Sequence, residues 1–326
     1  RVRNEQETSL AQAKLQEIRE IWAEWLPRDK DRAATLEAEY NRRYNRIVPR
    51  AYDGSHLTFP GLSSTMGGKP LNLRRHQRAG ALRMVERGEI DDTAGLGYYP
   101  GAGKTLTAIC GAVKRLQLGL SQKVAIVVPK AVLGQWQQTF YDVYPGLADW
   151  MLVGTDRAFD ERNRRAFLLQ AAMSGARIVL LTYEQFRTIP VRPATFGAYL
   201  TREIVDLEAA LLDAEGDDDG AKKNLERAFK ARQQALADFE ARYASKWKKI
   251  SDAGNADIAW EAWGVDLLIV DEGHSFKRDV FMTKMDGVSG LPRGESQRAF
   301  DMRVKLHYTT TPDLFPGPIE GRAPGK

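Results

Sequence analysis

The hydrophobic pattern of the chain changes at about residue 90. Before that point, apolar residues recur three or four positions apart among charged ones, which is typical of amphipathic helices. A proline or a glycine closes each pattern, so helices are predicted over residues 4–26, 31–48 and 73–88. Residues 50–70 are rich in Gly, Ser and Pro and predict a surface connection.

Beyond residue 90, short and fully apolar runs alternate with helical patterns. Buried strands are predicted at 123–129, 177–182 and 265–270, and a weaker strand at 93–99. Helices are predicted from Lys104 to about Gly119, at 131–142 and at 160–174. Strands that are apolar on both faces and separated by helices indicate a parallel sheet covered on both sides. The predicted fold class is therefore α/β.

Residues 195–251 interrupt this alternation. The spacing of four leucine and isoleucine residues fits a coiled-coil seam: Leu200, Ile204, Leu207 and Leu211. An acidic turn at 216–220 and a second helical pattern follow. We predict a helical hairpin that projects from the sheet domain and is inserted between two strands. A structural spacer and a clamp on DNA or a partner both remain open as its role.

Composition narrows the class of protein. The chain has no apolar run near the roughly 20 residues that span a bilayer, and its first residues lack a signal-peptide pattern, so no membrane is expected among its partners. The single cysteine, Cys110, excludes an internal disulfide and favours a reducing compartment, which we take to be the cytoplasm. The net charge of +5 is mildly basic. Basic clusters at 42–50, 74–78, 162–165 and 246–249 fit either DNA phosphates or solvated helix faces.

A loop of small residues leads into the helix predicted after residue 103. Gly101, Ala102 and Gly103 leave backbone N–H groups free to surround phosphate oxygens, and the helix N-terminus favours negative charge. Lys104 is expected to reach the β- and γ-phosphates, and the Thr105 hydroxyl to bind Mg²⁺. Tyr98 stands where the stricter pattern has its first glycine. A plain solvated turn is the alternative.

Two acids and a histidine follow the apolar run at 265–270. Asp271 and Glu272 should emerge at the carboxyl edge of the sheet, where ligands bind in such folds. Asp271 is expected to hold Mg²⁺ through water, and Glu272 to orient and deprotonate an attacking water. His274 is assigned to the catalytic group as a coupling residue rather than a metal ligand. A solvated loop start is the alternative.

These stretches resemble a known family. Asp271-Glu272-Gly273-His274 resembles the DEAH-type motif II of superfamily-two helicases, with glycine for the usual alanine, and Gly101–Thr105 resembles their motif I. Gln77 resembles the upstream glutamine that reads adenine in these helicases. Residues 127–136 resemble motif Ia of the Swi/Snf-type branch, and residues 182–186 resemble its next DNA-facing motif. Residues 274–278 resemble the extension of motif II.

The resemblance implies a RecA-like first ATPase lobe at 71–326, with the helical insertion at 195–251 and an N-terminal helical extension and linker at 1–70. It implies ATP and Mg²⁺ as cofactors and double-stranded DNA as partner. The ATP-binding residues would be Gln77, Gly101, Ala102, Gly103, Lys104 and Thr105; the metal-binding ones Thr105 and Asp271; the catalytic ones Lys104, Asp271, Glu272 and His274; the DNA-binding ones Lys130, Tyr183 and Lys277.

Two expected parts of such a motor are not evident in the chain. Thr309–Thr311 imitates motif III, but the preceding residues are half polar, so we expect motif III beyond Lys326. The second lobe is expected outside this chain as well. Because that lobe supplies an arginine finger worth about 10³-fold or more in rate, little activity is expected of the chain alone.

A narrower likeness covers most of the chain. Tyr44-Asn45, Tyr52–His56 and the long insertion resemble helicase modules of large phage and mobile-element proteins, some of which fuse a DNA methylase to the motor, as in the defence-against-restriction type. This likeness implies a second lobe and a methylase domain as partners, and a bacterial host cytoplasm or a phage particle as location.

The sequence thus favours the first lobe of an ATP-dependent double-stranded DNA translocase. Two other classes remain open. One is a P-loop kinase or transferase, against which Gln77 and the motif II extension argue. The other is a catalytically weak ATP-binding scaffold in a phage or defence complex, which the departures at Tyr98, Gly273 and Arg278 permit.

Overall fold

The computed structural model describes residues 5–44, 51–90, 94–213, 258–276 and 297–311, together with a few positions between 226 and 237. The chain divides into two compact units, Arg1–Ala51 and Tyr52–Lys326. None of the helices described is long and apolar enough to cross a membrane.

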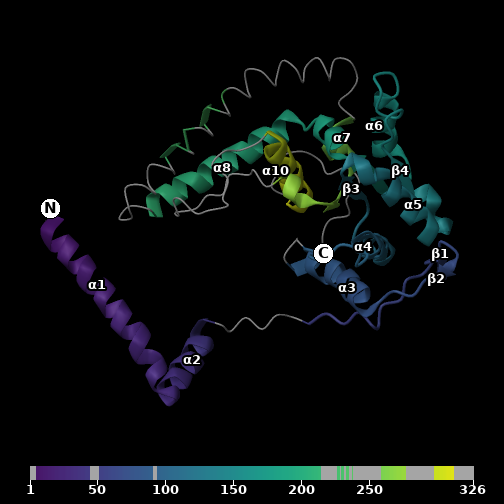
Figure 1. Cartoon of the computed structure of the whole chain (residues 1–326). Coiled ribbons are helices and arrows are strands. Elements are labelled where there is room, and N and C mark those ends of the chain that lie inside the picture. Colours follow the sequence, from purple (N-terminus) through teal and green to yellow (C-terminus); the bar gives the residue numbers. More distant parts are fainter. Residues whose placement is uncertain are drawn as a thin grey trace. The chain divides into compact units, whose positions relative to one another are not determined.

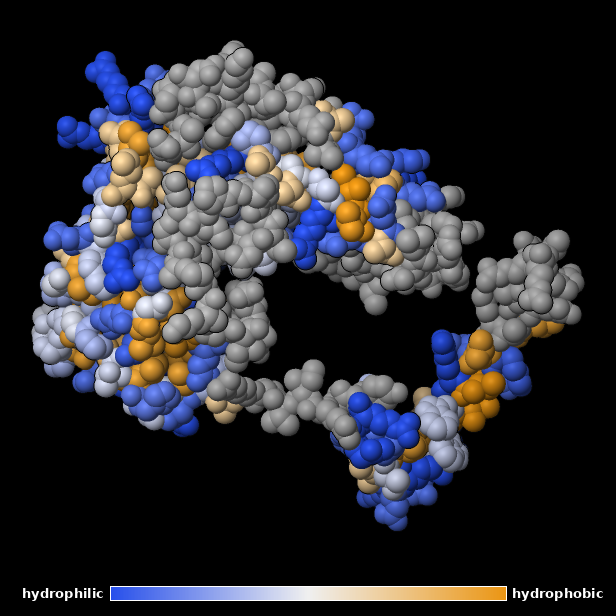
Figure 2. Space-filling view, turned by 180° about the vertical axis from the view of Figure 1, so that it is seen from behind, coloured by the Kyte–Doolittle hydropathy of each residue, from blue (hydrophilic) through white to orange (hydrophobic). Residues whose placement is uncertain are grey.

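The first unit consists of two helices. Helix α1 (Glu5–Trp25) ends where Pro27 begins a 3₁₀ turn, η1 (Leu26–Arg28), and α2 (Lys30–Tyr44) follows. The guanidinium of Arg32 lies 3.4 Å from the centre of the Trp25 ring, so it holds the two helices at their junction. Both predicted helices are confirmed. The rings of Trp22 and Trp25 are exposed, and beside them the exposed leucine and isoleucine side chains of α1 form an orange surface in Figure 2: Leu10, Leu15, Ile18 and Ile21.

The second unit is built on a four-stranded parallel sheet of order β4-β5-β3-β6. The strands are β3 (Val124–Val128), β4 (Met151–Val153), β5 (Ile178–Thr182) and β6 (Leu267–Val270). The three strongly predicted strands are confirmed, whereas β4 was missed because it is too short to give a pattern. The strand predicted at 93–99 is wrong for residues 94–99, which form no strand. Gly95 and Gly97 weaken pairing there.

Helices cover both faces of this sheet (Figure 1). They are α3 (Arg75–Ile90), α4 (Lys104–Leu118), α5 (Leu133–Val143), α6 (Arg164–Met173), α7 (Tyr183–Thr188), α8 (Pro193–Asp213) and α10 (Gln297–Thr310). Successive side chains of β3 point to opposite faces: Ile126 packs with residues of α4 and α5, and Val127 with residues of α6 and α10. The predicted doubly covered sheet is therefore confirmed.

The predicted connection at 50–70 contains a small hairpin, β1 (Thr65–Met66) with β2 (Lys69–Pro70). Gly67 and Gly68 form its turn, and both have positive φ angles, 58° and 74°. This pair of φ values matches the two-residue turn that joins antiparallel strands.

The first part of the predicted insertion packs against the sheet unit. Leu200 and Leu207 of α8 are buried, and α8 lies beside α10 (Figure 1). Glu203 accepts a hydrogen bond from Tyr199 Oη at 2.6 Å and pairs with Arg303 Nη1 of α10 at 2.9 Å. The part of α8 around these residues is therefore packed, and the projection of the whole hairpin stays a prediction. The acidic turn at 216–220 and most of the return helix lie outside the described residues.

Thr309 and Thr310 form the last turn of α10, so the residues directly before them are helical. The Thr309 side chain is buried and donates to Lys305 O at 2.8 Å, as threonines within helices do. Thr309–Thr311 therefore does not occupy the position after a buried strand that motif III requires.

Candidate functional site

A cavity of about 600 Å³ lies beside β6 and at its carboxyl end. Its polar end is formed by Lys104 at the start of α4 and by the residues that follow β6. Its apolar part is formed by β6 with side chains of α3, α4 and α10. The lining residues are Met84, 94–98, Lys104, Ala108, Trp136, 267–274 and Leu306. The structure thus brings the predicted Lys104, Asp271, Glu272 and His274 to one cavity.

The loop before α4 has the backbone that its small residues predicted. Gly101 and Gly103 have φ angles of 79° and 85°, which L side chains rarely adopt. Gly103 is the N-cap of α4, and no side chain caps the helix, so its first N–H groups are available to a ligand. Lys104 Nζ donates to Tyr98 O at 3.1 Å. Thr105 is half-buried and is not among the residues that line the cavity.

Gln77 fastens this loop to α3. Its side chain is only 7% exposed and does not line the cavity. Its Oε1 accepts from Arg74 N at 2.9 Å, and its Nε2 donates to Ala102 O at 3.3 Å. His76 Nε2 lies 2.9 Å from the same carbonyl oxygen. The amide therefore positions the loop in this structure, and its predicted contact with adenine stays a prediction.

The turn after β6 is held by two aromatic side chains. Asp271 N donates to Val127 O at 3.0 Å, so the turn begins at the last pairing of β6 with β3. Asp271 Oδ2 accepts from the indole Nε1 of Trp136 at 3.0 Å. Tyr183 Oη donates to Asp271 O and lies 3.2 Å from Glu272 O. These bonds fix the backbone and one carboxylate of the predicted metal site.

Glu272 has an unusual conformation. Its φ angle is positive, at 51°. In the described part of the chain, Glu272 is the one non-glycine residue with a positive φ. Its carboxylate is half-exposed, and its Oε2 lies 3.1 Å from Nδ1 of the exposed His274. Backbones of this kind persist where the surroundings hold them, often at functional sites. The predicted coupling role of His274 stays a prediction.

The predicted DNA-binding residues lie in different environments. Lys130 is exposed and pairs with Asp156 Oδ2 at 2.9 Å. Tyr183 is 6% exposed, and burial raises the pKa of its hydroxyl. In this structure its hydroxyl donates to the turn after β6, and its predicted contact with DNA stays a prediction. Lys277 lies outside the described residues.

Trp136, His76 and Tyr183 are the supporting residues that sequence reasoning missed in these roles. Trp136 lies in the stretch 127–136 that resembles motif Ia, and this likeness does not predict its contact with Asp271. Trp136 lies 135 positions from Asp271 in the sequence, so no local pattern connects the two. The order of strands, which places β3 next to β6, is what brings them together.

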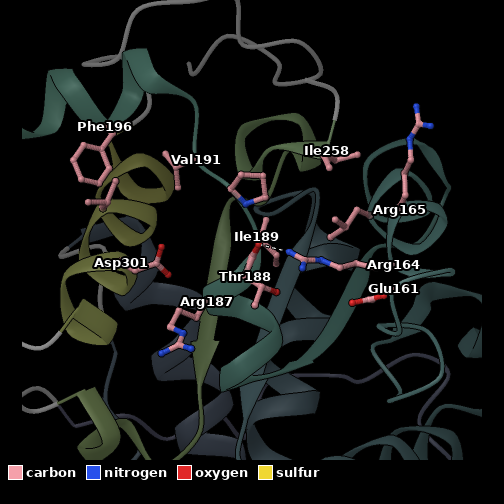
Figure 3. A pocket seen from close by; sticks show the side chains of 13 residues that line it. Glu161, Arg164, Arg165, Arg187, Thr188, Ile189, Val191, Phe196, Ile258 and Asp301 are labelled. Carbon is pink, nitrogen blue, oxygen red and sulfur yellow. Dashed lines mark hydrogen bonds between the residues drawn. The ribbon is translucent and has the colours of Figure 1, made fainter. Parts of the chain in front are cut away.

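A second cavity, of about 640 Å³, lies near the end of α7. Figure 3 shows Asp301 entering from α10 on one side and Arg164 from the other, while Arg165 points away. Arg164 donates to Thr188 O, and burial lowers its pKa. Burial raises the pKa of Asp301, although Lys305 Nζ donates to its Oδ2 at 2.8 Å. None of the predicted site residues lines this cavity, so the first cavity is the candidate site.

Comparisons with known proteins give the family of the chain. Residues 89–311, more than half of the chain, match a family described as "Probable helicase domain", and residues 1–46 match a domain of unknown function, DUF8437. The chain is 26% identical over 328 aligned residues to Defense against restriction protein B of Escherichia phage P1. That alignment covers 89% of this chain and 14% of the relative, so the chain spans a small part of that protein. By the first match, the chain belongs to the family of probable helicase domains.

Proposed function

We propose that the chain is the first ATPase lobe of a motor that moves on double-stranded DNA. The observation that carries this proposal is the cavity in which Lys104, from the loop before α4, lies with Asp271 and Glu272, from the turn after β6. A cation at a helix N-terminus and a carboxylate pair at a sheet edge are the groups that a metal–triphosphate complex requires.

The residues fit ATP and Mg²⁺. The uncapped N-terminus of α4 and its glycine loop offer N–H groups to phosphate oxygens, and Lys104 adds a positive charge. Thr105 and Asp271 would hold the metal ion, which neutralises charge on the phosphates when bound. The cavity volume of about 600 Å³ is within the range of small-molecule sites. Gln77 would read adenine only after its amide leaves Ala102 O.

The chain's own residues then have separate tasks. Lys104 binds and orients the terminal phosphate, and Asp271 positions the metal ion. Glu272 accepts the proton of the attacking water, because its carboxylate is half-exposed and lines the same cavity. His274 orients Glu272 through the contact between Nδ1 and Oε2. A second lobe would complete the cleft and supply an arginine.

DNA would contact the exposed segment after β3, where Lys130 stands, and mostly through phosphates. Lys277 would add a second cationic contact. The name of the phage relative supports a place in an anti-restriction protein that acts in the cytoplasm of a bacterial host or is carried in a phage particle. A second motor lobe and a DNA methylase domain are the proposed partners.

The test is the ATPase activity of the full-length protein with and without duplex DNA. Lys104→Ala should abolish DNA-stimulated hydrolysis through loss of the phosphate contact. Glu272→Gln should keep ATP binding and block turnover, because an amide cannot take a proton from water. Hydrolysis that survives Glu272→Gln contradicts the assigned base. Binding without hydrolysis in the wild type would indicate a scaffold, and phosphate transfer to an acceptor a kinase.

A further inference from the structure

We infer that Trp136 and Tyr183 form an aromatic clamp that positions Asp271 and Glu272 and couples them to the segments that follow β3 and β5. Both clamp residues act through the turn after β6; Trp136 also lines the cavity beside Asp271, whereas Tyr183 is not among its lining residues. The inference rests on the proposed function and names a regulatory connection of the same site.

Trp136 holds the carboxylate of Asp271. Trp136 is 2% exposed and packs in the core formed by α4, α5 and the sheet, so packing fixes the orientation of the indole. An indole N–H can only donate, and most buried ones have an acceptor. The acceptor is Asp271 Oδ2, at 3.0 Å. One carboxylate oxygen is thereby fixed, and the orientation of the other, Oδ1, is set for a metal-bound water.

Tyr183 holds the backbone of the same turn. It is the first residue of α7, whose start is fixed by a capping box between Thr182 and Gln185. Its ring packs edge-on against Phe276, with ring centres 5.0 Å apart. Its hydroxyl donates to Asp271 O and lies 3.2 Å from Glu272 O. The left-handed backbone of Glu272 is therefore braced at the peptide groups on which it depends.

The two clamp residues come from segments at the carboxyl ends of neighbouring strands. Trp136 follows the exposed Lys130 on the segment after β3, and Tyr183 directly follows β5. A shift of either segment reaches the turn after β6 through a single hydrogen bond. This arrangement gives a physical route by which contact at the sheet edge changes the metal site.

The first test is the affinity for Mn²⁺, a paramagnetic probe of the magnesium site, measured by electron paramagnetic resonance in the presence of ATP. Trp136→Phe keeps the ring and removes the donor. Groups that support a metal ligand typically change metal affinity 10- to 100-fold, so we expect Mn²⁺ binding to weaken by at least about 10-fold. Binding of a fluorescent ATP analogue (mant-ATP) without metal should be unchanged.

Trp263→Phe is the matched control. Trp263 is equally buried, and its indole N–H has no hydrogen-bond partner among the described residues. It packs on the other face of the sheet, so its replacement should leave Mn²⁺ affinity within about twofold of the wild type, well short of the change expected at the clamp. A clamp variant that unfolds is replaced by Asp271→Ala, which keeps Trp136 and removes the acceptor of its indole N–H. The tryptophan emission maximum should then shift, and an unchanged maximum would overturn the inference.

The second test separates turnover from binding. Tyr183→Phe should lower the DNA-stimulated kcat at least about 10-fold and leave the KM for ATP unchanged, because it frees the turn that carries Glu272 without touching the phosphate loop. Tyr199→Phe is the control, since it removes another buried hydroxyl, which donates to Glu203 Oε1 at 2.6 Å. A kcat equal to that of the control overturns the role of Tyr183.

The outcomes distinguish the two proposals. If the wild type binds no mant-ATP, the proposed function fails, and the inference fails with it. If the wild type binds mant-ATP and hydrolyses ATP but Trp136→Phe binds Mn²⁺ as tightly as Trp263→Phe, only the clamp is overturned.

Discussion

Replacing Gly103 by alanine should loosen the loop before α4, because the added side chain would meet Gln77. A Cβ added at Gly103 would overlap Gln77 Nε2 and lie 3.5 Å from Gln77 Cδ. The amide would have to move, and its hydrogen bond to Ala102 O, now 3.3 Å, would be lost. The φ of 85° is also unfavourable for alanine.

The size of the effect follows from these two terms. A left-handed backbone costs an L residue roughly 1–2 kcal/mol, and one lost hydrogen bond costs about 1 kcal/mol. We therefore expect Gly103→Ala to lower the free energy of unfolding by about 2–3 kcal/mol. In a unit of this size each kcal/mol corresponds to about 2–4 °C in Tm. The assay is thermal unfolding followed by circular dichroism, with mant-ATP affinity measured in parallel.

Two glycines of the same chain serve as controls. Gly101 has a φ of 79° but open space around a Cβ, so Gly101→Ala should show the backbone term alone, about 1–2 kcal/mol. Gly134, in α5, has open space and no positive φ, so Gly134→Ala should be neutral or stabilising. Adding Gln77→Ala to Gly103→Ala should remove the overlap. Equal stabilities of Gly103→Ala and Gly101→Ala would refute the contact between Gln77 and the loop.

Other predictions concern single side chains. Burial raises the pKa of Cys110 to about 12, so Ellman's reagent at pH 8 should not label it in the native protein and should label it in urea; rapid native labelling would contradict its burial. Burial lowers the pKa of His307 from 6.5, so its contribution to stability is fully present above pH 6.5 and is lost as the pH falls through the lower folded-state pKa. Urea unfolding from pH 8 to 5 should show this loss and show less of it in His307→Gln. Lys130→Ala should leave stability within about 0.5 kcal/mol and reduce the salt dependence of DNA binding by about one ion, while Asp156→Ala should tighten binding; an unchanged salt slope would remove Lys130 from the interface.

Much of the fold could be predicted because its signals are local. The apolar runs that became β3, β5 and β6 are continuous, and α4 ends at Gly119, whose φ of 72° suits a left-handed cap. Strand β4 has only three residues and gave no such signal. The pattern of residues 94–99 predicted a strand. These residues pair with no strand in the described part of the chain, and their glycines weaken pairing.

The candidate site was predictable at the level of motifs and not at the level of contacts. The strand order was not needed to pick out Lys104, Asp271 and Glu272, since each stands at the end of a recognisable element. The partners of these residues depend on which elements become neighbours. Gln77 illustrates the difference. Its motif predicts a contact with a ligand, whereas in the structure its amide bonds to the backbone of Arg74 and Ala102.

The arrangement of the site follows from the parallel topology. In a sheet whose strands all run the same way, every segment after a strand begins at the same edge. The pairings of β3 with β5 and β6 therefore place the segment with Lys130 and Trp136, the segment with Tyr183 and the turn with Asp271 beside one another. One edge then brings together a surface cation, two aromatic donors and the acidic pair. The donors are buried and the cation is exposed, so the proposed contact with a polyanion would lie at the surface and the proposed chemistry in the cavity that Trp136 and Asp271 line. The hydrogen bonds from Trp136 and Tyr183 to Asp271 would connect the two.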